Sequence, residues 1–206
     1  MATIADNLQA VEGRIAAAAQ AAGRAPAAVT LLAVSKTHPA ALIERAFAAG
    51  QRAFGENYVQ EALEKMDALA ACKGIEWHLV GPLQSNKTRL ATARFDWVHT
   101  VDGEKIARRL SGQRSGNLPP LNVLIQVNVS GEASKSGVAP AEVEALARAV
   151  SALPRLKLRG LMAIPEPGAE AARFNQVRTI FENLKNKFRF DTLSMGMSDE
   201  IGRAHV

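Results

Sequence analysis

The sequence has little cysteine and lacks a long apolar run. Cys72 is its single cysteine among 206 residues, which excludes an internal disulfide or a site built from several thiolates. A stretch of about 18 consecutive apolar residues, which a membrane-spanning helix needs, does not occur. The N-terminus carries Asp6 and Glu12 and lacks the basic start and apolar core of a secretory signal. These absences predict a soluble, cytoplasmic protein.

Aromatic residues are also few, at 5%, and charge of one sign is only modestly in excess. The 25 Lys and Arg against 20 Asp and Glu leave a net charge of +5. This balance favours anionic partners in general but is weak support for a nucleic-acid or scaffold function. The four histidines, at positions 38, 78, 99 and 205, lack the close spacing of a metal site. With 48% hydrophobic residues the chain can bury a core, and we expect one domain over residues 1–206.

Short β-rich runs alternate with helical segments along the chain. An amphipathic helix is predicted first, from Ile4, Leu8, Val11 and Ile15 at helical spacing. Seven strands are then predicted at residues 29–35, 52–55, 75–80, 97–101, 123–129, 156–164 and 192–197. Helices are predicted between them near residues 39–49, 57–71, 86–93, 103–113, 140–152 and 170–187. The alternation indicates an α/β protein with a parallel sheet.

Two parallel architectures fit this alternation, a barrel and an open doubly wound sheet. Polar residues end nearly every predicted strand, which favours a (β/α)8 TIM-type barrel, because such a rim converges on one site. The first strand also lacks the glycine-rich turn usual for a doubly wound nucleotide-binding sheet. Only eight residues follow Ser198. We therefore expect a barrel with an extra N-terminal helix and with its eighth strand missing or altered.

Lys36 is the most informative single residue. It follows an apolar strand, LLAVS, so that it would face a partly dry site. A desolvated lysine amine is a good nucleophile toward a carbonyl. A solvated loop lysine is the alternative, and the pattern alone leaves both open.

Three other strand ends carry candidate residues. Asn57 could cap the following helix or face the rim. His78 could face the site or be a hydrogen-bonded core histidine, which is commoner. Ser194, with the small residues after it, suits an anion, since barrels often bind phosphate after strand seven. A lysine amine and a phosphate site together would suit a phosphorylated aldehyde.

The sequence also resembles the pyridoxal phosphate homeostasis protein family, which is similar to the barrel domain of alanine racemases. The stretches that match are LLAVSKTHPA, FGENYVQEAL, IEWHLVGPLQSNK, FDWVHTVD, PPLNVLIQVNVSGEASKSG, LRGLMAIPEP and DTLSMGMSDE. They cover most of residues 29–200 in the family's order. The sequence departs from the family at His38, where a lysine is usual, and after Glu200, where the family continues with a helix and a strand.

The resemblance implies a set of cofactor-binding residues. Lys36 would form the aldimine with pyridoxal 5′-phosphate (PLP), and Lys135 would lie near the pocket entrance. The positions expected around the cofactor ring are Asn57, His78 and Met162, and those expected near its phosphate are Ser194, Gly196 and Ser198.

The implied function is PLP binding in vitamin B6 homeostasis. The protein would carry or buffer PLP as a monomer with little or no turnover, so we expect no enzyme, and PLP-dependent apo-enzymes are possible acceptors. Racemases of this type use a tyrosine from a second domain, whereas this chain has one tyrosine, Tyr58, and no second domain to present it. The alternative is a PLP-dependent racemase or decarboxylase on the same lysine.

Overall fold

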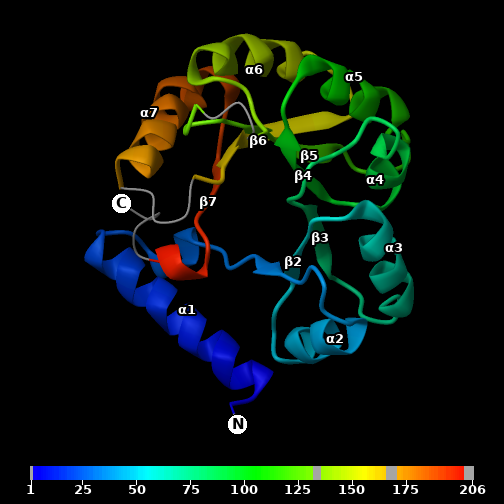
Figure 1. Cartoon of the computed structure of the whole chain (residues 1–206), viewed down its shortest axis with the longest axis vertical. Coiled ribbons are helices and arrows are strands. Elements are labelled where there is room, and N and C mark those ends of the chain that lie inside the picture. Colours follow the sequence, from blue (N-terminus) through cyan, green and yellow to red (C-terminus); the bar gives the residue numbers. More distant parts are fainter. Residues whose placement is uncertain (1, 132–135, 166–170, 202–206) are drawn as a thin grey trace.

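The computed structural model describes residues 2–131, 136–165 and 171–201. These residues form a curled sheet of parallel strands with helices on its outer side (Figure 1). The strands are β1 (Ala33–Val34), β2 (Ala53–Glu56), β3 (Glu76–Leu79), β4 (Trp97–Val101), β5 (Leu121–Gln126), β6 (Leu156–Ala163) and β7 (Thr192–Met195). The α-helices are α1 (Ile4–Ala21), α2 (Ala40–Ala48), α3 (Val59–Ala68), α4 (Thr88–Arg94), α5 (Glu104–Gln113), α6 (Val143–Ser151) and α7 (Ala171–Phe188). Short 3₁₀ helices are η1 (Pro26–Ala28), η2 (Pro140–Glu142) and η3 (Ser198–Glu200).

The strand order separates the two architectures that the sequence left open. The strands pair in sequence order, from β1 at one edge to β7 at the other. A doubly wound sheet reverses direction and places its first strand inside the sheet. The open doubly wound alternative is therefore wrong, and the described residues form a curled, seven-stranded parallel sheet with β1 and β7 as its edge strands.

The predicted strands and helices all occur; the strand at residues 97–101 has the predicted bounds, and the ends of the other elements are shifted. The first strand was expected over residues 29–35, but only Ala33–Val34 pairs with β2. Residues 29–32 are not in a strand, and residues 26–28 before them form η1, with Pro26 at its start. Because β1 is an edge strand, only β2 pairs with it. Its length is therefore limited to the residues that lie beside β2.

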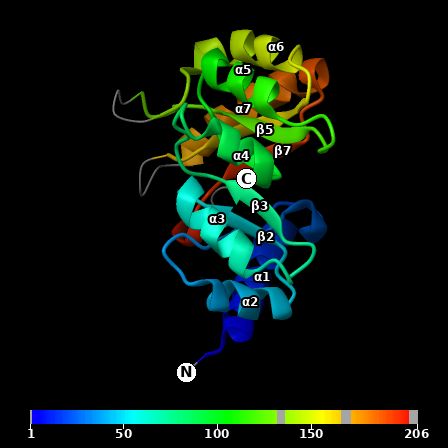
Figure 2. The same cartoon turned by 90° about the vertical axis from the view of Figure 1, so that its right-hand side faces the viewer.

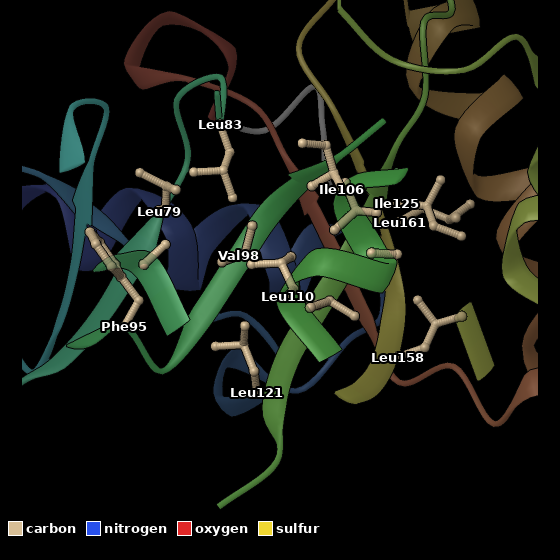
Figure 3. Close-up of a cluster of buried hydrophobic side chains, with 14 of the residues drawn as sticks. Leu79, Leu83, Phe95, Val98, Ile106, Leu110, Leu121, Ile125, Leu158 and Leu161 are labelled. Atoms are coloured by element: carbon tan, nitrogen blue, oxygen red, sulfur yellow. The ribbon is translucent and has the colours of Figure 1, made fainter. Parts of the chain in front are cut away.

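Alternation along the strands separates two apolar regions. Leu79 and Val98 point toward the helices and belong to the large core between sheet and helices (Figure 3). Trp97, one residue before Val98, belongs instead to a small separate cluster with Leu124 and Met162. Because successive strand side chains point to opposite faces, this second cluster lies on the concave inner face of the sheet.

Helix α1 packs beside α2 and η1, at the end of the molecule opposite α6 (Figures 1 and 2). A capping box starts it, in which Thr3 Oγ1 accepts from Asp6 N and the Asp6 side chain accepts from Thr3 N. Ile15 and Ala19 are its buried residues. The Arg14 guanidinium donates to Ser198 O over 3.3 Å, which ties α1 to η3. None of the described helices combines the length and apolar character of a membrane span.

Candidate functional site

Lys36 and Asn57 lie at the carboxyl end of the sheet. Val34 pairs with Gly55, and the two candidate residues each follow this pair by two positions on neighbouring strands. Lys36 is exposed and Asn57 is half-buried. The expected partly dry setting for Lys36 is therefore wrong in this structure, because the lysine follows β1, an edge strand of the described sheet that pairs with β2 alone.

The backbone of Asn57 is packed against Gly81, which follows β3. A Cβ atom at Gly81 would lie 2.2 Å from Asn57 O, closer than any contact allows. Gly81 O in turn accepts from Thr100 Oγ1 at 2.8 Å, so the glycine is held from the β4 side as well. The first residue of α3 follows Tyr58, which occupies the N-cap without a side-chain cap hydrogen bond. Asn57 therefore does not cap the helix, and its position is set by packing.

His78 on β3 is the start of a hydrogen-bonded chain across the inner face. Its Nδ1 lies 2.9 Å from His99 Nε2, and His99 Nδ1 lies 2.8 Å from Ser194 Oγ on β7. Its ring also stacks on Trp97, with ring centroids 5.3 Å apart. His78 is thus both buried and directed inward, which joins the two interpretations that the sequence left open.

Burial keeps both histidines neutral. Desolvation lowers the pKa of His78 to about 3, with a further contribution from the adjacent His99. Desolvation also lowers the pKa of His99 to about 4. Among the described residues, His78 Nε2 has no hydrogen-bond partner, and the Glu76 carboxylate lies 3.8 Å away. Each neutral ring can donate through one nitrogen only, so the pair forms a chain with a defined direction.

The remaining candidates lie on β6 and beyond. Met162 is buried in the inner cluster and pairs in register with the half-buried Ser194. Gly196 and Ser198 are exposed in the segment that follows β7, and Gly196 has a φ of +85°. Lys135 lies outside the described residues. His78 and Ser194 are thus brought together through His99, whereas Lys36 and Asn57 lie just beyond the ends of β1 and β2.

Sequence reasoning missed a buried ionic group beneath Lys36. The Lys65 ammonium on α3 donates to Glu56 Oε1 at 2.8 Å, to Ser35 O at 2.7 Å and to Glu61 Oε1 at 2.7 Å. Lys65 and Glu56 are 7% and 0% exposed. The signal for this group was Lys65 itself, which falls on the same helix face as Ala62, Met66 and Leu69, where an apolar residue is expected.

Comparison with known proteins places the chain in a family. The family model described as "Alanine racemase, N-terminal domain" matches residues 7–205. The pyridoxal phosphate homeostasis protein of Pseudomonas aeruginosa is 59% identical over 208 aligned positions, which cover 99% of this chain and 89% of that protein. This chain belongs to the pyridoxal phosphate homeostasis protein family.

Solved structures agree with this membership. PipY of Synechococcus elongatus PCC7942, whose structure has PLP bound, is 39% identical with a TM-score of 0.80, covering 94% of this chain and 92% of that chain. Alanine racemase from Corynebacterium glutamicum is 20% identical, with a TM-score of 0.58 over 88% of this chain and 50% of its own, which shows a shared fold only. Most of this pyridoxal phosphate homeostasis family member therefore matches about half of the length of that alanine racemase.

Proposed function

We propose that this protein binds PLP through Lys36 and acts in vitamin B6 homeostasis as a carrier or buffer of the cofactor. The observation that carries the proposal is the PLP-bound PipY structure, to which this chain is similar over 94% of its length. The name of the 59% identical Pseudomonas aeruginosa relative supports the homeostasis role. The PLP-binding unit would be a single domain over residues 1–206.

The residues at the carboxyl end of the sheet suit such a ligand. When bound, PLP supplies an aldehyde carbon that an amine can hold covalently. The exposed Lys36 amine is free to react with it, and the buried Met162 provides an apolar surface for a ring. Asn57 and His78 are proposed as further ring contacts. The proposed phosphate donors are Ser194, Gly196 and Ser198, with Lys135 at the entrance.

Little or no turnover is proposed because a racemase needs a second acid or base opposite the lysine. Tyr58, the only tyrosine of the chain, is 60% exposed at the start of α3. An open site of this kind would let PLP enter and leave, and apo-enzymes that require PLP would be its acceptors. The alternative function, a racemase or decarboxylase, predicts substrate turnover that Lys36→Ala abolishes.

The architecture proposed for the complete site is a (β/α)8 barrel. The two edge strands of the described sheet, β1 and β7, are the positions between which an eighth strand would pair. The carboxyl ends of the seven described strands would then form most of the rim.

The first test is an absorbance titration with PLP on the wild type, Lys36→Ala and the control Lys105→Ala, which removes an exposed lysine from α5. We expect a new long-wavelength band in the wild type and the control, and none in Lys36→Ala. Borohydride reduction followed by peptide mapping should place the pyridoxyl group on Lys36. A folded wild type without the band, or with PLP mapped to other lysines, would refute the proposal.

A further inference from the structure

The main chain on both sides of Lys36 is held by hydrogen bonds to other elements. Before it, Ser35 N donates to Gly55 O at 2.8 Å, and Ser35 O accepts from Lys65 Nζ at 2.7 Å. After it, Thr37 N donates to Glu61 Oε1 at 2.6 Å. The two peptide units next to the lysine are therefore fixed, while its side chain is exposed.

In the group that holds them, Lys65 and Glu56 are buried and Glu61 is half-buried. Ser35 Oγ donates to Glu56 Oε1 at 2.6 Å, and the Lys65 ammonium contacts both oxygens of Glu56, at 2.8 and 3.0 Å. An ammonium has three donors, and those of Lys65 are used by Ser35, Glu56 and Glu61. The hydrogen bond from Lys65 lowers the pKa of Glu61, so its carboxylate is ionised at neutral pH. Lys65 is thus saturated as a donor and can act only through what it holds.

The residue after Lys36, which this group binds, has an unusual backbone conformation. Thr37 has a φ of +64°, in the left-handed region that a β-branched residue rarely adopts. Such a conformation persists only when surrounding contacts impose it. Two hydrogen bonds stabilise this turn: Thr37 N donates to the Glu61 carboxylate, and His38 N donates to Ser35 O at 3.1 Å.

We propose that Glu56, Lys65 and Glu61 are positioning residues that hold the main chain of Lys36 so that its amine meets the aldehyde of PLP. This inference rests on the proposed function, and adds to it the residues that direct the amine. If these residues only joined β1 to β2 and α3, they would stabilise the protein as much as in the positioning role. They would not, however, affect the rate at which Lys36 captures PLP.

The test compares Glu61→Ala with Glu64→Ala, which removes an exposed glutamate from the same helix. Without PLP, we expect the Thr37 amide to exchange with solvent about tenfold faster in Glu61→Ala than in Glu64→Ala, as measured by NMR. We also expect capture of PLP by Lys36, trapped with borohydride and mapped by mass spectrometry, to slow by about tenfold. Glu61→Gln should restore most of both, because its amide oxygen can still accept from Thr37 N. Lys65→Met, checked for folding by circular dichroism, should slow capture at least as much.

Reductive methylation of Lys36 by formaldehyde is the control for intrinsic reactivity. This small aldehyde needs no docking, so its rate should be equal in all folded variants. Equal PLP capture by Glu61→Ala and Glu64→Ala, or equal Thr37 exchange, would overturn the positioning role. A wild type that is methylated at Lys36 but captures no PLP would instead refute the proposed function, and the positioning role with it.

Discussion

His78 and His99 show how burial sets the charge of single residues. Two histidines hydrogen-bonded to each other cannot both be protonated at low cost, since like charges repel strongly where water is excluded. Their pKa values of about 3 and about 4 mean that both stay neutral far below the ordinary 6.5. The folded protein therefore resists taking up two protons that the unfolded chain accepts readily.

This resistance predicts a loss of stability in acid. Because the folded pKa values are depressed, the free energy of unfolding should be unaffected above about pH 6.5 and fall as pH drops toward 4, by up to about 1.4 kcal/mol per pH unit for each histidine. His99→Gln removes one of these titrating groups, so it should reduce the slope by up to about 1.4 kcal/mol per pH unit relative to the exposed control His38→Gln. Urea unfolding between pH 4.5 and 7.5 measures it. Equal slopes in the two variants would contradict the assignment.

Gly81 occupies a position that has no room for a side chain. Since a Cβ there would lie 2.2 Å from Asn57 O, Gly81→Ala should cost about 1–3 kcal/mol of stability and displace Asn57. Gly13→Ala, in open space within α1, should stabilise by about 0.5–1 kcal/mol. Thermal unfolding of both variants checks the pair. A Gly81→Ala protein as stable as the wild type would show that the contact relaxes freely.

At the scale of elements, α3 has two tasks. Its buried stripe of Val59, Ala62, Met66 and Leu69 packs into the core, as helical periodicity demands. Lys65 lies within that stripe and is buried through its ion pair with Glu56. The helix therefore both covers the sheet and carries the ionic group to the end of β1.

Helix α1 depends on its capping box for its first turn. Thr3→Ala removes the acceptor for Asp6 N, and we expect a loss of about 1 kcal/mol together with faster amide exchange over residues 4–7. Thr3→Ser keeps the hydroxyl and should behave as the wild type. Hydrogen exchange followed by mass spectrometry resolves the first turn. Equal protection in both variants would mean that packing, and not the cap, holds the start of α1.

At the scale of the whole molecule, PLP binding should raise the free energy of unfolding and the Tm. A ligand at 100 times its dissociation constant stabilises the folded state by about 2.7 kcal/mol, which corresponds to about 5–10 °C in Tm for a chain of this size. Calorimetry should show this shift with PLP and a smaller one with pyridoxal, which lacks the phosphate. Lys36→Ala should lose most of the shift. An unchanged Tm in the wild type would argue against a specific site.

The sequence by itself determined the order and type of the elements. Each strand and helix has its own local signature, an apolar run such as residues 123–129 or a helical spacing such as that of Ile4 and Leu8, and needs no distant contact to be recognised. The family resemblance, carried by contiguous stretches such as LLAVSKTHPA, was confirmed for the same reason. The roles of the candidate site residues stay predictions.

Only the tertiary structure decided which residues meet. Lys65 reaches Ser35 across 30 positions, and His99 reaches Ser194 across 95. Strand pairing and curling of the sheet create these contacts, and no local pattern encodes them. The exposure of Lys36 was likewise decided by the position of β1 at the sheet edge. The local sequence specifies the helices and strands, whereas the burial of a side chain and its hydrogen-bond partners are decided only when these elements pack together.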